Sequence, residues 1–248
     1  MKSIVSQIPN IITLLNLSSG VVAIVFALEG RLVTSAIIIL FAAGLDFLDG
    51  MAARVLKAYS DIGKELDSLA DVVSFGVAPA MIYLGLMHQT MEYGTSLLPA
   101  PGAPVIIWWF LSATLLIPAA SAYRLAKFNI DTRQSGSFLG LPTPANAILW
   151  AGLAFISQLS ANQGLVSKLL SPINLLALAI LTSLLMVSEL PMFSLKLSNF
   201  RIANNLYRYL LLLIAILLIV LTGIHAPALI VISYILLSMM LYLLKIKA

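Results

Sequence analysis

Long apolar runs alternate with short polar segments along the chain, and each run is compatible with the roughly 20 residues that a helix needs to cross the hydrocarbon core of a bilayer. Eight such runs can be counted, at 9–28, 32–56, 63–88, 104–127, 142–160, 171–189, 204–222 and 226–244. Prolines obscure the starts of the fifth and sixth runs, although a proline is tolerated in the first turn of a helix. The pattern predicts an all-α integral membrane protein, a bundle of about eight transmembrane helices.

The composition agrees with this pattern. Of the 248 residues, 61% are hydrophobic and only 10% are charged, whereas a soluble domain carries about a quarter charged residues. The absence of cysteine excludes disulfides and thiolate metal sites. The first apolar run lacks a small-residue cleavage pattern, so we expect a retained helix and not a signal peptide. Without any sign of a soluble domain, residues 1–248 are interpreted as a single transmembrane domain.

The distribution of basic residues predicts the orientation. If all eight runs cross the membrane and the N-terminus is cytoplasmic, twelve of the 14 Lys and Arg residues fall inside, and only Arg31 and Lys168 fall outside. Both chain ends then lie on the cytoplasmic side, and we expect the protein in the cell membrane. The net charge of +4 suits anionic lipid headgroups. The basic loops carry no nucleic-acid motif, so we expect membrane lipids and not nucleic acid as partners.

Acidic residues are concentrated in the stretch LDFLDGMAARVLKAYSDIGKELDSLAD, from Leu45 to Asp71, which holds five aspartates and one glutamate of the ten acidic residues. Asp46 and Asp49 are three residues apart and therefore share one face of the second predicted helix. Asp67 and Asp71, four apart, share a face of the third. A short turn joins the two helices, so the two acidic faces can oppose each other.

Four converging carboxylates would repel one another at neutral pH, and near the bilayer each is costly to place, by up to ~2.5–3.5 kcal/mol at the centre. Bound cations would compensate, and hard oxygen ligands suit Mg²⁺, Mn²⁺ or Ca²⁺. Gly50, Ala53 and Gly63 leave room beside the acids, although close helix packing explains small residues equally well. Arg54 could bind phosphate oxygens as a bidentate donor. Together these residues suggest a metal-bridged phosphate ligand, and two metal ions on a diphosphate could neutralise it and polarise the phosphorus under attack.

The spacing D-x2-D-G-x2-A-R-x8-G-x3-D-x3-D, from Asp46 to Asp71, resembles the signature of the CDP-alcohol phosphatidyltransferases. The resemblance implies transfer of a phosphatidyl group from CDP-diacylglycerol to an alcohol, with release of CMP. It implies that two divalent cations, Mg²⁺ or Mn²⁺, are held by the four aspartates. The CDP-diacylglycerol site would include Gly50, Ala53, Arg54, Gly63 and Ser74. Asp71 would be the candidate base, although a metal ligand is ordinarily a poor base.

Five further stretches resemble the phosphatidylserine synthase branch of this family. They are PNIITLLNLSSG at 9–20, SFGVAPA at 74–80, YRLAKFN at 123–129, GLPTPA at 140–145 and SELPMFSLK at 188–196. This likeness implies L-serine as the acceptor, a homodimer, and eight helices where the wider family typically has six. The last two helices, at about 204–244, would then be peripheral to a six-helix catalytic core.

A serine pocket needs a cation or helix-end N–H groups for the substrate carboxylate. Arg124 lies at the cytoplasmic end of the fourth predicted helix, Arg133 follows in the loop, and Thr143 lies at the start of the fifth helix, where an anion is favoured. Interfacial anchoring is the alternative role for both arginines. Other acceptors stay open, namely glycerol 3-phosphate, inositol and inositol phosphate. A cation or proton-coupled transporter is disfavoured, because the rest of the second and third helices is apolar and broken-helix repeats are missing.

Overall fold

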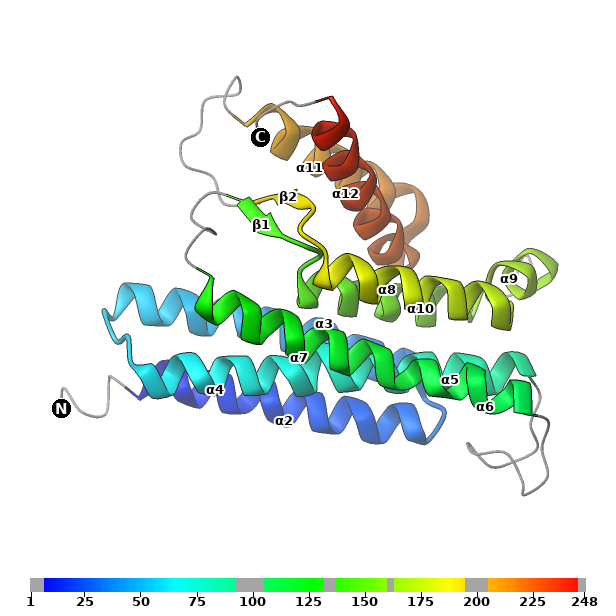
Figure 1. Ribbon diagram of the computed structural model, residues 1–248, viewed down its shortest axis with the longest axis horizontal. Helices are drawn as coiled ribbons and strands as arrows, with labels where there is room; N and C mark the ends of the chain where they lie inside the picture. Colours follow the sequence, from blue (N-terminus) through cyan, green and yellow to red (C-terminus); the bar gives the residue numbers. More distant parts are fainter. Residues whose placement is uncertain (1–6, 92–104, 132–136, 160–162, 195–204, 245–248) are drawn as a thin grey trace.

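The computed structural model describes residues 7–91, 105–131, 137–159, 163–194 and 205–244. Its first two helices, α2 and α3, form a hairpin whose tight turn contains Gly30 at a φ of 75°. A positive φ is easy only for glycine, so this residue type fits the turn. The bounds are Ile8–Leu28 for α2 and Leu32–Val55 for α3. The two helices pack against each other along the lower part of the molecule (Figure 1).

The third helical run is continuous over 31 residues, Asp61–Met91. It consists of α4 (Asp61–Asp71), the π-helical turn η1 (Val72–Val77) and α5 (Ala78–Met91). Ser60 caps α4, because its hydroxyl accepts a hydrogen bond from the Gly63 backbone N–H at 3.0 Å. The π turn follows Asp71 directly and packs against α2, α7 and α8. It therefore lies at the centre of the bundle. Single π turns inside α-helices are frequently found at functional sites.

The remaining helices follow in chain order, and α6, η2 and α7 join end to end (Figure 1). Their bounds are Val105–Ser112 for α6, Ala113–Leu115 for the 3₁₀ turn η2, Leu116–Ile130 for α7, Thr143–Ile156 for α8, Gln163–Leu169 for α9, Pro172–Val187 for α10, Leu206–Thr222 for α11, Gly223–His225 for the 3₁₀ turn η5 and Ala226–Leu243 for α12. Helices α11 and α12 form a hairpin that lies on α8.

A short antiparallel pair of strands, β1 (Ser137–Leu139) and β2 (Pro191–Phe193), joins the segments before α8 and after α10. The register pairs Ser137 with Phe193 and Leu139 with Pro191. Gly140 follows β1 at a φ of 75°, and a Cβ there would collide with carbonyl oxygens at the end of α10. The backbone of GLPTPA is therefore pressed directly against α10.

The core is built by close backbone approach. A Cβ added to Gly152 would collide with the backbone of Ala228, and one added to Gly20 would collide with Ser74. Small residues at such crossings let membrane helices gain van der Waals contact. The largest buried pair, Tyr83 and Trp150, packs edge to face with ring centroids 5.4 Å apart.

The helices agree in position with all eight predicted runs, and the structure is that of an integral membrane helical protein. Among the described residues, four stretches are long and apolar enough to cross a membrane, Ile8–Leu28, Leu32–Val55, Asp61–Met91 and Leu206–Leu243, the last containing both α11 and α12. A fifth is obtained if α9 and α10, bent by 48°, count as one span. Helix α8, with 14 residues, is shorter than such a span. The all-α expectation missed the two strands, because three-residue segments leave no readable alternation.

Candidate active site

Three aspartates come together where α3 ends and α4 begins. Asp46 and Asp49 lie one turn apart on α3, and Asp67 lies on α4; both helices pack on α2. One carboxylate oxygen from each aspartate lies within 4.8 Å of the others. Asp49 is buried and the other two are partly buried. The two acidic faces thus oppose each other, as the spacing predicted.

Asp71 lies deeper, one turn beyond Asp67 and next to the π turn. It is buried, and it interacts electrostatically with the three other aspartates and with Arg124. In the described part of the chain, Oδ1 of Asp67 and Oδ1 of Asp71 are buried and accept no hydrogen bond. Buried acceptors without partners are rare and point to a missing ligand such as an ion. Since carboxylate oxygens suit Mg²⁺ and Mn²⁺, these residues fit a divalent cation.

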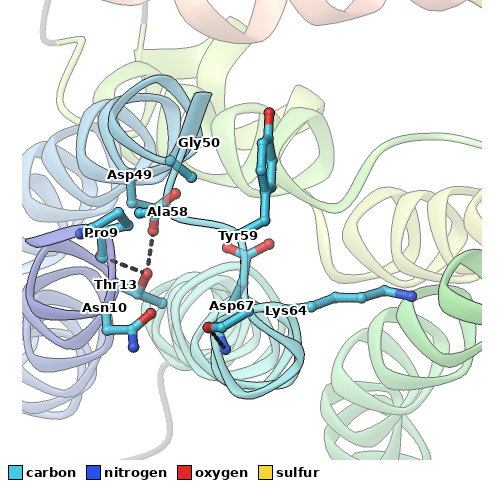
Figure 2. A pocket seen from close by; sticks show the side chains of 12 residues that line it. Pro9, Asn10, Thr13, Asp49, Gly50, Ala58, Tyr59, Lys64 and Asp67 are labelled. Atoms are coloured by element: carbon cyan, nitrogen blue, oxygen red, sulfur yellow. Dashed lines mark hydrogen bonds between the residues drawn. The ribbon is translucent and has the colours of Figure 1, made fainter. Parts of the chain in front are cut away.

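A pocket of about 170 Å³ opens beside the three aspartates. Its lining comes from α2, α3, α4 and the turn between α3 and α4: Pro9, Asn10, Thr13, Asp49, Gly50, Ala53, Ala58, Tyr59, Ser60, Gly63, Lys64 and Asp67. Figure 2 shows Asp49 and Asp67 on facing elements, while Lys64 extends away from them. The Lys64 amine instead donates to the carbonyl of Asn129 on α7 at 3.0 Å. The carboxylates that line the pocket are therefore available to cationic ligands.

Helix α2 supplies a pocket residue that the sequence reasoning missed. The Thr13 hydroxyl lies 2.6 Å from Oδ2 of Asp49 and 3.0 Å from the carbonyl of Pro9, and both side chains of the Thr13–Asp49 pair are buried (Figure 2). A hydroxyl has one proton, and the shorter, charge-assisted bond to the carboxylate is the stronger. The available signal was the spacing of Asn10, Thr13 and Asn16, which share one face of α2.

The small residues of the signature differ in what they do. A Cβ at Gly50 would meet only Nη1 of Arg54, at 3.8 Å, so this glycine faces the open pocket. A Cβ at Gly63 would lie 2.9 Å from Asn10 Oδ1, so Gly63 also lets α4 approach α2. The packing alternative therefore applies to Gly63 and not to Gly50. Ala53 lines the pocket as well.

Two other residues predicted for the nucleotide site lie outside the pocket lining. Arg54 is exposed, one turn beyond Gly50. Ser74 is fully buried in η1, where its hydroxyl donates to the carbonyl of Asn16 at 3.0 Å. Ser74 thus holds η1 against α2. The binding of CDP-diacylglycerol by these residues stays a prediction.

The predicted acceptor residues lie farther along the chain. Arg124, on α7, is buried, and its Nε has no hydrogen-bond partner within the described residues. Its guanidinium carbon lies 5.8 Å from the centroid of the Phe128 ring. Thr143, the first residue of α8, is fully buried, and its hydroxyl likewise lacks a partner there. Arg133 lies outside the described residues. Burial argues against interfacial anchoring of Arg124, because anchoring side chains reach toward water.

Comparison with known protein families shows the family to which this chain belongs. The sequence model described as CDP-alcohol phosphatidyltransferase matches residues 6–194. The chain belongs to the CDP-alcohol phosphatidyltransferase family. The four signature aspartates lie on α3 and α4, within the matched region. Helices α11 and α12, which begin at Leu206, lie beyond that region.

Curated relatives within the family carry the name CDP-diacylglycerol–serine O-phosphatidyltransferase. The protein from Mycobacterium leprae is 39% identical over 153 residues, which are 59% of this chain and 46% of that protein. The protein from Bacillus subtilis is 35% identical over 150 residues, 60% of this chain and 76% of that protein. The protein from Methanocaldococcus jannaschii is 34% identical over 183 residues, 74% of this chain and 72% of that protein. The match thus spans less than half of the mycobacterial relative.

Proposed function

We propose that this protein transfers the phosphatidyl group of CDP-diacylglycerol to L-serine, giving phosphatidylserine and CMP. The observation that carries the proposal is the approach of Asp46, Asp49 and Asp67 to within 4.8 Å, with the unpartnered carboxylate of Asp71 one turn deeper. The names of the relatives favour serine as the acceptor. The same site would serve another acceptor, such as glycerol 3-phosphate, inositol or inositol phosphate, with the same chemistry.

The four aspartates would hold the divalent cations, two in number and Mg²⁺ or Mn²⁺ in kind. When bound, such ions neutralise a diphosphate and polarise the phosphorus under attack. The remaining tasks in binding the donor lipid fall to small residues of the pocket and to one arginine. Gly50, Ala53 and Gly63 would leave space for the nucleotide close to the backbone, and Arg54 would lie near phosphate at the pocket edge.

On the acceptor side, Arg124, Thr143 and Arg133 would bind the serine carboxylate. Because Arg124 and Asp71 interact electrostatically, a serine held by Arg124 would have its hydroxyl near Asp71. In the reaction the hydroxyl oxygen forms a bond to the phosphorus of the phosphatidyl group. The bond from that phosphorus to the CMP oxygen breaks, and CMP leaves. Asp71 would accept the proton of the hydroxyl, provided that its free oxygen is not occupied as a ligand.

The proposed orientation puts this site on the cytoplasmic side of the cell membrane. The pocket lies at the end of the bundle that carries Arg54, Lys57 and Lys64, whereas Arg31 follows the opposite end of α2. Eight crossings with both chain ends inside are consistent with this arrangement. Serine and CMP would diffuse through the cytoplasm, and the lipid tails would stay in the bilayer. The homodimer rests on the family resemblance alone.

The test is CMP release by the purified protein from CDP-diacylglycerol, with Mg²⁺, Mn²⁺ or EDTA, across serine, glycerol 3-phosphate, inositol and inositol phosphate. We expect metal-dependent release with serine alone. Release with a different alcohol would keep the reaction type and reject the serine pocket. No release with any acceptor would reject the enzyme and favour the transporter alternative.

A further inference from the structure

Three residues link α4 to α7 on the side of η1 that faces the start of α4. The η1 turn itself packs on α7. One turn before η1, Oγ of Ser68 accepts a hydrogen bond from Nδ2 of Asn129, near the end of α7, at 2.8 Å. One turn before that, the Lys64 amine donates to the backbone carbonyl of Asn129 at 3.0 Å. Asn129 is therefore bonded to two successive turns of α4.

The donors and acceptors of this link fit one another. The Ser68 hydroxyl donates its only proton to the Lys64 carbonyl at 3.2 Å, so its oxygen is left as an acceptor for Asn129. Asn129 accepts through its backbone and donates through its side chain. The three hydrogen bonds thus close a ring between the two helices. Ser68 and Asn129 are both partly buried, and a hydrogen bond is stronger where water is partly excluded.

The bonded residues of α4 share a face with two of the proposed metal ligands. Lys64, Asp67, Ser68 and Asp71 are spaced at i, i+3, i+4 and i+7, which in a helix is a single stripe. At about 100° per residue, Asp67 and Ser68 lie on the two borders of this stripe. On one border Asp67 approaches the aspartates of α3, and on the other Ser68 is bonded to α7. A rotation of α4 about its axis would therefore disturb both contacts together.

We propose that Asn129 is a positioning residue for the metal site, which fixes the rotation of α4 through Ser68 and so directs Asp67 toward the aspartates of α3. The inference rests on the proposed function, in which these carboxylates hold divalent cations. Converging carboxylates repel one another until cations bind, and the bond to α7 opposes a rotation of α4 that would relieve this repulsion. The same helix α7 carries Arg124, so the link joins the two proposed halves of the site.

The test is Mn²⁺ titration of purified Asn129→Ala and Ser68→Ala, which each remove one partner of the same hydrogen bond. We expect both variants to lose Mn²⁺ affinity by about fivefold, the equivalent of one hydrogen bond. The double variant should lose no more than either single variant, because both changes break one bond. Ser68→Thr, which keeps the hydroxyl, should bind Mn²⁺ as the wild type does. Wild-type affinity in N129A and S68A would overturn the proposal, as would full additivity in the double variant.

The matched control is Lys127→Ala, two residues before Asn129 on α7. Nζ of Lys127 pairs with Oε1 of Glu189 at 3.2 Å, so this variant breaks a bond of the same helix end that is not directed at α4. It should leave the Mn²⁺ affinity unchanged. An equal loss of affinity in K127A would overturn the proposal, because the general placement of α7 would then explain the effect. A lower Tm of N129A with wild-type Mn²⁺ affinity would overturn it too, since Asn129 would then serve stability alone.

Failure of the proposed function has a different result. A wild-type protein that binds Mn²⁺ but releases no CMP with serine would reject the proposed function alone, and the titrations of N129A and S68A would still decide the role of Asn129. A wild-type protein that binds no Mn²⁺ would reject the metal site, and the role of Asn129 with it.

Discussion

The donor and acceptor sides of the site are built in different ways. On the donor side, the four aspartates and the small residues of the pocket come from one stretch of 26 residues, folded as α3, a turn and α4. On the proposed acceptor side, Arg124 lies on α7 and Thr143 begins α8. Helical spacing puts each pair of donor aspartates on one face, and the short turn and the shared packing on α2 bring the two faces together. The two proposed acceptor residues lie on separate helices, so only tertiary packing could bring them to one substrate.

The largest effect should come from removing charge on the donor side. Asp46→Asn, Asp49→Asn and Asp67→Asn keep the side-chain shape and remove a hard anionic ligand. We expect each to lower CMP release by on the order of a thousandfold, since a bound metal contributes several kcal/mol to such a reaction. Mn²⁺ binding, followed by titration of the purified protein, should weaken in parallel.

The control for these variants is Asp61→Asn, at the start of α4, where the side chain is exposed and outside the three-carboxylate group. It should retain activity and Mn²⁺ binding. Full activity in two of the three aspartate variants would contradict the metal site. The contrast between the donor side and the acceptor side would then fail as well.

The next effect should fall on the acceptor side alone. Arg124→Lys keeps the positive charge beside Asp71 but loses the planar fork that binds a carboxylate through two bonds. We expect kcat/KM for serine to fall about 30-fold, within the range for truncating a buried charged pair. The KM for CDP-diacylglycerol should change little. An equal rise in both KM values would mean that Arg124 serves the whole site, and the two-sided description would be wrong.

The sequence predicted the approach of the three aspartates but not the contacts between distant elements, for a physical reason. Asp46, Asp49 and Asp67 lie on helices whose spacing fixes their direction, so their approach followed from the helix–turn–helix pattern. Thr13 was missed because its contact with Asp49 joins residues 36 positions apart. The two strands were missed because segments of three residues have no readable alternation. The eight helices were placed correctly because apolar runs of this length have few other solutions.

Thr13→Val tests how far α2 supports the metal site. The change keeps the shape of the side chain and removes the hydroxyl that donates to Asp49. Groups that hold a metal ligand in place typically contribute 10–100-fold to metal affinity, and we expect a loss of about tenfold in Mn²⁺ affinity. Thr13→Ser should restore the affinity, because it returns the donor. If T13V binds Mn²⁺ as tightly as the wild type, the Thr13 hydroxyl does not help to orient Asp49, and α2 only lines the pocket.

The smallest effect separates pocket space from helix stability on a single helix. Gly50 and Gly44 both lie within α3, and alanine at either position should stabilise the helix by up to ~1 kcal/mol. A Cβ at Gly44 meets nothing within 4 Å, whereas a Cβ at Gly50 enters the pocket beside Asp49. We therefore expect G44A and G50A to raise the Tm alike, while only G50A raises the KM for CDP-diacylglycerol, by a few-fold. If G50A leaves that KM unchanged, the nucleotide does not approach this backbone, and the donor site must extend toward Asp71 and the π turn instead.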